Sequence, residues 1–498
     1  MGRASPMFKK VVIANRGEIA IRIARTLREL GVASAAVFTE ADRESAHLEF
    51  VDEACALGAD ARAYLDVERI VAAARSLGAD ALHPGYGFLS ENADLAEACE
   101  RANITFIGPP ASAISAMGSK QRARALMNAA GVPIVPGGPA GTLDEARASA
   151  ASVGYPVLIK ATDGGGGKGM RRVDDERELV AAYERTRSES MAAFGSDRVH
   201  IEKALVAARH VELQILGDRH DTIVPLYERD CSLQRRHQKI LEETPCPALS
   251  QATLERMVEV GVAGARSIGY YSAGTFEFLL DEQQNFYFLE MNTRLQVEHP
   301  ITELITGLDL VREMLRVAAG QRIAEEAPPR RGAAIEARIY AEDPSRGFLP
   351  SPGVVERLLE PAGPYVRIDS GIRQGSRVSA EYDPLLAKLC VWGADRAQAI
   401  ARMRRALAEY VVAGVETNLS FLLAVTSDAD FEAGRYDTEF VARRHDLLKP
   451  PPLDDAAKRD LATALSALAA CEQPRREFAE TQSSSVSPWV LAERARLR

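Results

Sequence analysis

The chain has little cysteine, and its cysteines do not form a recognisable framework. Six cysteines are scattered over 498 residues, and no two stand at Cys-x-x-Cys spacing. This pattern argues against a disulfide scaffold and a zinc site, and favours a reducing compartment. The sequence shows no apolar run near the ~20 residues of a membrane span, and residues 1–7 lack the apolar core of a signal peptide. We therefore expect a cytoplasmic protein with no membrane partner.

The sequence also lacks an excess of positive charge. Its 61 Lys and Arg residues are outnumbered by 70 Asp and Glu residues, which gives a formal net charge of −9. Such a balance provides no global field for nucleic acid, so nucleic acid is not an expected partner. Hydrophobic residues make up 46% and charged residues 26%, as in ordinary globular proteins. The length is too great for one simple domain and suggests roughly three.

The three-glycine fingerprint of dinucleotide-binding folds is absent. Residues 8–14 form a buried-strand pattern, followed by a helix over 18–30, a strand over 32–38 and a helix over 68–77. This alternation predicts a parallel, doubly wound sheet of Rossmann-like shape. Its first turn holds a single glycine, Gly17, so the shape does not imply NAD.

The rest of the chain divides into further regions. A second region begins near Met117, and a third, rich in strand patterns, begins near Ala333. A Pro-Pro-Pro breaker at 450–452 then precedes a helical pattern over 454–470 and a polar linker at 481–487. We expect this tail to be a separate segment.

The segment EMNTRLQVEHP, which follows a predicted β-hairpin, holds the densest group of polar and charged residues. Side chains alternate along a strand, so Glu290, Asn292 and Arg294 are expected to share one face. By the same alternation, Phe286 and Phe288 are expected to begin that row.

A second carboxylate is expected beside this row. Glu277 lies on the partner strand, where it interrupts aromatic and aliphatic residues. Carboxylates on neighbouring strands repel and are costly to bury, so their presence favours a hard cation such as Mg²⁺ between them. An exposed hairpin edge is the alternative for one glutamate alone. The whole set with Arg294 and Glu298 favours a functional site.

A run of four glycines at 164–167 lies between two strand patterns, at 155–160 and 169–173. It lacks the Gly-Lys-Ser/Thr ending of a Walker loop, so Walker-type chemistry is not expected. Glycine amides can close over phosphate oxygens, and such a loop can move as a lid. A flexible linker is the alternative. Lys160 and Lys120 favour the phosphate interpretation because each can place a cation against phosphate.

Two further segments are candidates for nucleotide contacts. Main-chain groups of residues 202–205 can pair with an adenine edge, and Leu205 can cover its face; an ordinary strand end is the alternative. In the segment RHVE, His210 is placed to point at ribose and metal, although a lone histidine is more often a satisfied surface or core residue.

The run 228–239 (ERDCSLQRRHQK) concentrates cations in an acidic chain. A solvated helix or loop surface is the default interpretation of such a run. Gln234 and Gln238 are neutral hydrogen-bonding groups suited to a small planar anion, which favours a site instead. The run has no interleaved aromatic residues, which disfavours nucleic acid.

Seven segments together resemble a known family. They are HPGYGFLSEN (83–92), KATDGGGGKGM (160–170), RHVE (209–212), ERDCSLQRRHQK (228–239), FEFL (276–279), EMNTRLQVEHP (290–300) and AEDP (341–344). In this order they resemble biotin carboxylase, the ATP-grasp component of biotin-dependent carboxylases, over about residues 8–445.

The resemblance implies a fold of the mixed α/β class (α+β overall). The implied parts are a Rossmann-like N-terminal domain (1–117), an ATP-grasp domain (118–333) whose mobile glycine-loop lid covers about 135–203, and a β-rich C-terminal biotin carboxylase domain (334–445). The tail, 446–498, lies outside the resemblance. We expect it to be a partner-docking segment, with a frayed terminus as the alternative.

The resemblance also implies a reaction in which ATP, bicarbonate and carrier-bound biotin give ADP, phosphate and carboxybiotin. By matching motifs, ATP would be held by Lys120, Lys160, Gly166, Gly167, Glu202, Lys203, Ala204, Leu205, His210, His237, Glu277 and Glu290. Two Mg²⁺ or Mn²⁺ ions would be bound by Glu277, Glu290 and Asn292. Bicarbonate would contact Lys239, Arg294, Gln296, Val297 and Glu298, and the biotin ureido group would contact Arg338 and Tyr86.

The implied catalytic residues are Lys239, Arg294, Glu298 and Arg338. Phosphoryl transfer depends mainly on positioning and charge neutralisation, which metals and cations provide. Glu298 would remove the bicarbonate proton during attack on the γ-phosphate, and Arg338 would stabilise the enolate-like oxygen of biotin. A structural ion pair with Glu336 or Glu342 is the alternative for Arg338.

The sequence departs from the family pattern in two places, and the second departure bears on partners. Ser119 stands where an acidic residue is common, which is expected to tune the loop and to leave the reaction intact. The chain has no Ala-Met-Lys-Met sequence and hence no site for its own biotin. We therefore expect a separate biotin carboxyl carrier protein and carboxyltransferase subunits as partners. The resemblance further implies a homodimer.

The expected pathway is that of acetyl-CoA carboxylase in fatty acid biosynthesis, with pyruvate carboxylase and propionyl-CoA carboxylase as alternatives. Another ATP-grasp ligase, such as one making carbamoyl phosphate, would use an amine acceptor. Arg338 and the segment from Arg294 to Glu298 speak against it. A non-catalytic nucleotide-sensing subunit would need a broken metal or base position. Glu277, Glu290, Asn292 and Glu298 are all present.

Overall fold

The computed structural model describes residues 7–162 and 170–448 together with residue 463. The chain divides into two units, Met1–Lys449 and Pro450–Arg498, and the first is described below. Apart from Thr463, the helix predicted over 454–470 lies outside the described residues. Among the helices that are described, none combines the length and apolar character needed to cross a bilayer.

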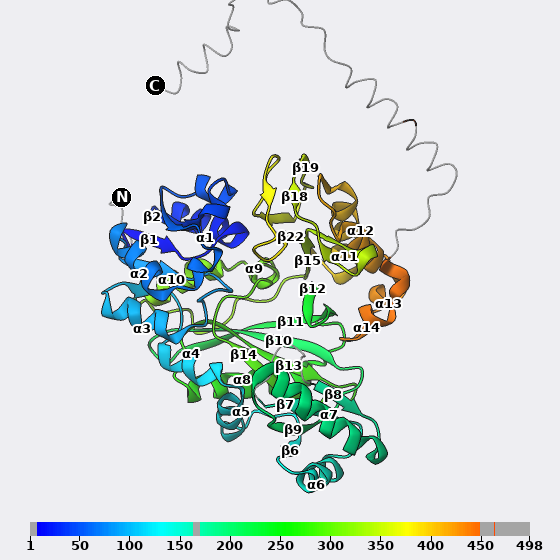
Figure 1. Cartoon of the computed structure of the whole chain (residues 1–498). Coiled ribbons are helices and arrows are strands. Elements are labelled where there is room, and N and C mark those ends of the chain that lie inside the picture. Colours follow the sequence, from blue (N-terminus) through cyan, green and yellow to red (C-terminus); the bar gives the residue numbers. More distant parts are fainter. Residues whose placement is uncertain (1–6, 163–169, 449–462, 464–498) are drawn as a thin grey trace, which may run out of the picture. The chain divides into compact units, whose positions relative to one another are not determined.

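The N-terminal region is a five-stranded parallel sheet, as the sequence predicts (Figure 1). Its strands, in spatial order, are β3 (Glu53–Gly58), β2 (Ala33–Thr39), β1 (Lys10–Ile13), β4 (Ala81–His83) and β5 (Thr105–Phe106). The associated helices are α1 (Gly17–Glu29), α2 (Val67–Ser76) and α3 (Ala93–Arg101). In α1, which corresponds to the helix predicted over 18–30, the buried residues Ile19, Ile23 and Leu27 form an apolar face, and Gly31 follows its end with φ +69°.

A separate four-stranded antiparallel sheet carries the predicted lid. Its order is β6 (Gly137–Pro139), β9 (Val199–Lys203), β7 (Val157–Ala161) and β8 (Met170–Val173). Helices α6 (Leu143–Val153) and α7 (Glu176–Phe194) pack on it around a small core of their own. The glycine loop joins β7 to β8, but Gly166 and Gly167 lie outside the described residues.

The largest sheet has eight strands and runs from the second region into the third. Its order is β14 (Phe286–Asn292), β13 (Ser272–Leu280), β10 (Arg209–Gly217), β11 (Ile223–Arg235), β12 (Gln238–Thr244), β15 (Ala333–Tyr340), β22 (Leu385–Gly393) and β20 (Val366–Ser370). β12 pairs with β15, so one ladder of hydrogen bonds crosses the proposed boundary at residue 333. The two regions therefore share one sheet.

The remaining elements surround these sheets (Figure 1). The helices are α4 (Ala111–Gly118), α5 (Lys120–Ala129), α8 (Gln251–Ser267), α9 (His299–Thr306), α10 (Leu310–Ala318), α11 (Arg396–Glu409), α12 (Leu419–Thr426), α13 (Ala429–Glu432) and α14 (Phe440–Arg443). Short strands are β16 (Glu342–Asp343), β17 (Leu349–Pro350), β18 (Gly353–Val354), β19 (Arg357–Leu359), β21 (Arg377–Val378) and β23 (Val411–Ala413).

The predicted row on β14 is wrong in one respect, because the strand contains a β-bulge. Glu290 pairs with Glu277, but Phe288 pairs with Phe278, so Leu289 is an extra residue. The bulge shifts the alternation, and Phe288 packs in the apolar core while Glu290 faces a cavity. Phe286 joins the same core.

The default alternative for 228–239, a solvated surface, does not hold for residues 228–234, which are buried. The segment forms the end of β11 and the start of β12, and Arg229, Asp230 and Ser232 are buried. Arg236 and His237 make the two-residue turn, with φ of +50° and +68°. Left-handed conformations at both turn residues match the twist of a hairpin, although non-glycine residues adopt them at some cost.

Candidate active site

A cavity of about 1400 Å³ lies among these elements. Every predicted site residue that the structure describes lines it: Tyr86, Lys120, Lys160, Glu202, Lys203, Ala204, Leu205, His210, His237, Lys239, Glu277, Glu290, Asn292, Arg294, Gln296, Val297, Glu298 and Arg338. The structure thus brings together groups from all three regions. Their individual roles stay predictions.

Lys239 is enclosed by three carboxylates, two on the sheet and one at the N-cap of α9. Its Nζ lies 2.5 Å from Glu212 Oε2, 2.8 Å from Glu277 Oε1 and 2.7 Å from Glu298 Oε1. Burial alone would lower the pKa of Lys239, but these negative charges outweigh it and raise the pKa well above its usual value. Lys239 is therefore a fixed cation in the centre of the site.

Glu298 is held as a carboxylate by two cations. Arg338 on β15 places Nη2 2.9 Å from Glu298 Oε2, and Lys239 contacts the other oxygen. Burial alone would raise the pKa of Glu298, but the charges of Lys239 and Arg338 lower it well below its usual value. The group is thus ionised and able to accept a proton.

Arg338 does not form the structural ion pairs that were the alternative for it. Its Nε donates to Glu242 Oε1 at 2.6 Å, and its second partner is Glu298. Glu342 instead pairs with Arg235 at 2.8 Å. Arg338 therefore links the Glu298 carboxylate to the sheet.

The pair Glu277 and Glu290 fits the expected divalent cation. They are cross-strand partners on β13 and β14, and both line the cavity. Burial and the nearby charge of Glu277 raise the pKa of Glu290, so its negative charge lacks sufficient compensation. Asn292 Nδ2 donates to Glu277 Oε1 at 2.8 Å, which places its amide in the same group. Two carboxylates and an amide are suitable ligands for Mg²⁺ or Mn²⁺.

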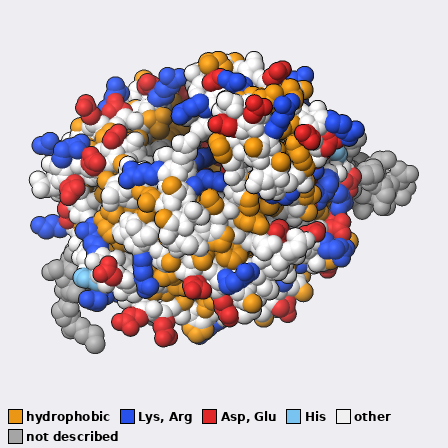
Figure 2. Space-filling model, turned by 90° about the horizontal axis from the view of Figure 1, so that it is seen from below, with side chains coloured by type: hydrophobic (Ala, Val, Ile, Leu, Met, Phe, Trp, Pro, Cys, Tyr) orange, Lys and Arg blue, Asp and Glu red, His pale blue; other side chains and the backbone are white. Residues whose placement is uncertain are grey.

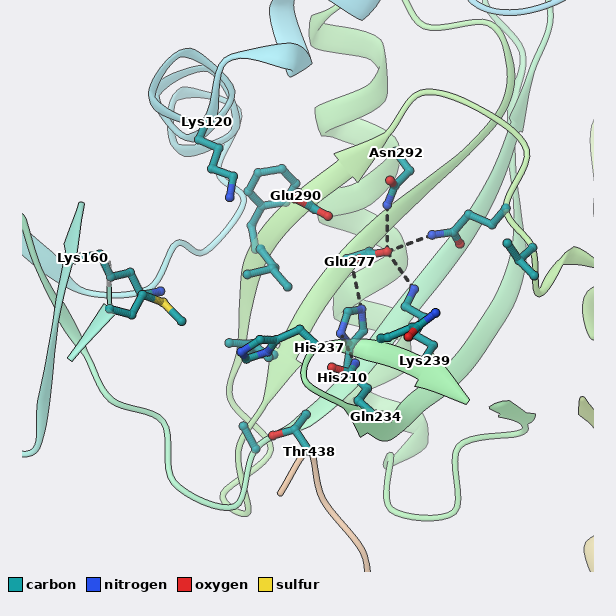
Figure 3. Close-up of a pocket in the computed structure, with 18 of the residues that line it drawn as sticks. Lys120, Lys160, His210, Gln234, His237, Lys239, Glu277, Glu290, Asn292 and Thr438 are labelled. Carbon is teal, nitrogen blue, oxygen red and sulfur yellow. Dashed lines mark hydrogen bonds and ion pairs between the residues drawn. The ribbon is translucent and has the colours of Figure 1, made fainter. Parts of the chain in front are cut away.

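His210 and Asn292 lie on opposite sides of Glu277 (Figure 3). Its Nε2 is 3.0 Å from Glu277 Oε2, and its Nδ1 is 2.9 Å from Gln234 Nε2. The Gln234 amide contacts Nδ1, whereas Nε2 lies close to the Glu277 carboxylate without the geometry of a hydrogen bond. Gln234, which the sequence favoured as an anion ligand, therefore orients His210.

The ligand atoms of His210, Glu212 and Glu277 gather within 4.8 Å of one another. Glu212 is nevertheless unsuited to be a metal ligand, because Arg229 at 2.5 Å and Lys239 at 2.5 Å occupy its two oxygens. We therefore interpret Glu212 as an anchor for Lys239.

Arg294 is oriented by a residue to which the sequence assigned no role. Glu91 accepts from Arg294 Nε at 2.9 Å and from the Thr293 amide at 2.9 Å. The second contact of the guanidinium is Asn292 Oδ1, 2.8 Å from Nη2. Glu91 belongs to the segment HPGYGFLSEN, so the motif was the signal that could have found it.

The opposite wall of the cavity carries cations suited to phosphates. Lys120 at the start of α5 and Lys160 on β7 lie across the cavity from the sheet that carries Glu277 (Figure 3). Glu202 contacts Lys160 and Arg124, each at 2.5 Å, and His200 at 3.2 Å. Burial would raise the pKa of Glu202, but the bond from His200 and the charges of Lys160 and Arg124 lower it to about 2.

The strand end at 202–205 offers fewer free groups than expected. The amides of Lys203 and Ala204 donate to the carbonyls of Pro136 and Pro156. The Lys203 ammonium donates to Gly154 and Tyr155 carbonyls at 2.9 and 3.0 Å. An adenine edge here would use other main-chain groups. Thr438, which the sequence did not suggest, also lines this end of the cavity (Figure 3).

Charged side chains of both signs are distributed over one face of the molecule. Lys and Arg side chains alternate with Asp and Glu side chains around the face in Figure 2, and its described part shows no broad area of one sign.

The fold and the site are those of an ATP-grasp ligase: Lys120 and Lys160 face the paired carboxylates Glu277 and Glu290, and the buried carboxylate of Glu298 lies beside two cations. Family models match residues 7–114 (biotin carboxylase, N-terminal domain), 119–326 (carbamoyl-phosphate synthase L chain, ATP binding domain) and 336–443 (biotin carboxylase C-terminal domain). Biotin carboxylase 1 of Bacillus subtilis is 49% identical over 87% of this chain and 98% of its own length. The chain belongs to the biotin carboxylase family.

Two further comparisons add detail. The mitochondrial methylcrotonoyl-CoA carboxylase subunit alpha of Mus musculus is 49% identical over 89% of this chain, which spans only 62% of that protein. The biotin carboxylase domain dimer of Hydrogenobacter thermophilus 2-oxoglutarate carboxylase, in complex with MgADP, ADP and bicarbonate, has a TM-score of 0.84 and 44% identity. That match covers 90% of this chain and all of the solved one.

Proposed function

We propose that this chain carboxylates biotin on a separate carrier protein, using ATP and bicarbonate. The arrangement of Glu298 between Lys239 and Arg338 carries this proposal, because it places an ionised base beside two anion-binding cations. Paired carboxylates and two lysines in the same cavity supply the rest of an ATP site. Biotin is a substrate and is not attached to this chain.

In the first step, Lys239 and Arg294 bind bicarbonate with the help of Gln296 and the Val297 main chain. Glu298 removes the bicarbonate proton while the bicarbonate oxygen attacks the γ-phosphorus. The bond from that phosphorus to the ADP oxygen breaks, which gives carboxyphosphate and ADP. Glu277, Glu290 and Asn292 would hold two Mg²⁺ or Mn²⁺ ions, which neutralise phosphate charge when bound.

In the second step, carboxyphosphate breaks down to CO₂ and phosphate, and the phosphate takes the N1 proton of biotin. N1 then bonds to the CO₂ carbon, and carboxybiotin forms. Arg338 stabilises the negative oxygen of the ureido group, with Tyr86 beside it. Closure of the proposed lid, about residues 135–203, excludes water meanwhile.

The remaining ATP contacts belong to the same proposal. Lys120 and Lys160 bind phosphates, together with the amides of Gly166 and Gly167. The nucleoside is surrounded by residues 202–205, His210 and His237.

We also propose that the chain has four parts, with bounds at 1–117, 118–333, 334–445 and 446–498.

The test is ADP release with each substrate omitted in turn. We expect turnover to require bicarbonate and Mg²⁺ and to rise with free biotin. ATP hydrolysis that is indifferent to biotin would contradict the proposal. Hydrolysis that requires an amine would support the carbamoyl-phosphate alternative. Residues 119–326 match the ATP binding domain of the carbamoyl-phosphate synthase L chain, which makes this alternative worth testing.

The final acceptor of the carboxyl group and the protein partners are proposed separately from the biotin carboxylation step. We expect a carrier protein and carboxyltransferase subunits as partners, a homodimer of this chain, and an acyl-CoA as acceptor. Acetyl-CoA was the sequence-based expectation, and the methylcrotonoyl-CoA carboxylase relative makes methylcrotonoyl-CoA an equal candidate. Reconstitution with each transferase and assay of both thioesters distinguishes them, since the transferase chooses the acceptor. A cytoplasmic location stays a prediction.

A further inference from the structure

Arg229 on β11 is a fully buried arginine to which neither the motifs nor the mechanism assign a role. All five of its N–H groups meet side-chain acceptors. They are Glu212 at 2.5 Å from Nε, Gln214 at 2.7 Å and Thr302 at 2.8 Å from Nη1, and Thr275 at 3.3 Å and Gln296 at 2.5 Å from Nη2. A guanidinium has five N–H donors, so this one is saturated.

One of the five acceptors, Gln296, belongs to the proposed bicarbonate site, and a second, Glu212, holds Lys239 of that site. Gln296 accepts from Arg229 through Oε1, which leaves its Nε2 to donate to Glu277 Oε1 at 2.8 Å. Glu212 accepts from Arg229 through Oε1 and contacts Lys239 through Oε2. The guanidinium thus fixes both the amide orientation of Gln296 and the carboxylate that anchors Lys239.

We propose that Arg229 is a positioning residue that shapes the bicarbonate pocket through Gln296 and Lys239. This inference rests on the proposed function. The planar fork reaches five acceptors at once, whereas a lysine ammonium carries only three donors and no planar geometry. The phosphate-binding wall, with Lys160 and Glu202, shares none of these contacts. Gln296 and Lys239 also contact Glu277, but only through Oε1, and its Oε2 faces His210. Disturbing Arg229 should therefore affect bicarbonate more than ATP.

The test is steady-state kinetics of the full-length Arg229→Lys variant. We expect the KM for bicarbonate to rise at least ~10-fold, because small displacements of positioning groups cost about this much or more, and the KM for ATP to stay within about twofold. The matched control is Arg330→Met, which breaks the neighbouring ion pair with Glu228 at 2.9 Å and should leave both KM values unchanged. Equal changes in both KM values, or an unchanged KM for bicarbonate, would overturn the inference.

A milder variant covers the case in which Arg229→Lys does not fold. Thr302→Val keeps the size of a fully buried side chain and removes one acceptor of Arg229. We expect a rise of about two- to fivefold in the KM for bicarbonate alone, since a smaller displacement follows. No rise would overturn the inference. If the unmodified protein shows no bicarbonate-dependent ADP release, the proposed function itself fails, which is a separate result.

Discussion

At the scale of single residues, Glu298 is defined by its two cationic neighbours. Arg338 at 2.9 Å and Lys239 at 2.7 Å hold it ionised without substrate. We expect Glu298→Gln to lower kcat at least ~100-fold, because the amide cannot accept the bicarbonate proton. ADP release at saturating ATP and bicarbonate measures this, with thermal unfolding as the control for folding. Retention of more than a tenth of kcat would exclude Glu298 as the base.

Glu202 should contribute to stability in a pH-dependent way. Its folded pKa of about 2 lies below the ordinary 4.5, so the stabilisation is complete above pH 4.5 and is lost as pH falls toward 2. We expect Glu202→Gln to destabilise the protein by a few kcal/mol at neutral pH, and the difference from the unmodified protein to narrow below pH 4.5. Urea unfolding at pH 7, 5 and 4 measures the difference. If the difference in unfolding free energy between the two proteins widens on acidification, the lowered pKa of Glu202 is contradicted.

At the scale of elements, the bulge at Leu289 changes which face of β14 each side chain lies on. Phe286 and Phe288 lie in the apolar core, whereas Glu290 faces the cavity. Deleting Leu289 restores regular alternation and keeps Phe288 in the core and Glu290 toward the cavity. We expect a folded protein whose activity falls at least ~10-fold, because the bulge aims Glu290. Circular dichroism and ADP release measure the two effects.

The matched control is deletion of Tyr287, on the other side of the bulge. There the shift brings Asn285 into the core position of Phe286, so we expect a loss of about 3–5 kcal/mol, as for removal of a core aromatic residue. If both deletions unfold the protein equally, the two faces do not depend on the bulge.

Local pattern predicted much of these elements. The apolar periodicity of α1 and the strand–helix alternation of the N-terminal region depend on neighbouring residues, and both predictions are confirmed. The faces of Phe286 and Phe288 were mispredicted because no residue type marks Leu289 as a bulge. Burial of Arg229 and Asp230 was missed because their partners, such as Glu212 and Arg209, come from β10. Such pairings become visible only once the sheet is assembled.

The site could be anticipated to a similar extent. The family resemblance named many of the described residues that line the cavity, including Lys239 and Arg338, which are far apart in the sequence but lie on neighbouring strands. The resemblance did not reveal that Arg338 pairs with both Glu242 and Glu298, or that Glu91 holds Arg294. These contacts depend on long-range geometry, which residue type and spacing do not encode.

At the scale of the whole molecule, Met1–Lys449 is a unit separate from Pro450–Arg498. We propose that the second unit docks a partner subunit. A chain ending at Leu448 should keep its ADP release with free biotin, because the cavity lies within the first unit, and should capture carrier or transferase more weakly. Co-purification with each partner measures this, and undiminished capture would remove the docking proposal.

The shared eight-stranded sheet has a consequence for how the protein can be divided. The connection between α10 and β15 is largely exposed around Glu325 and Glu326, while β12 and β15 remain joined by their ladder. Two polypeptides, 1–325 and 326–498, should therefore complement each other when produced in the same cell. They should co-elute as one species and regain bicarbonate-dependent turnover, since interstrand hydrogen bonds and the buried core can replace the missing covalent link.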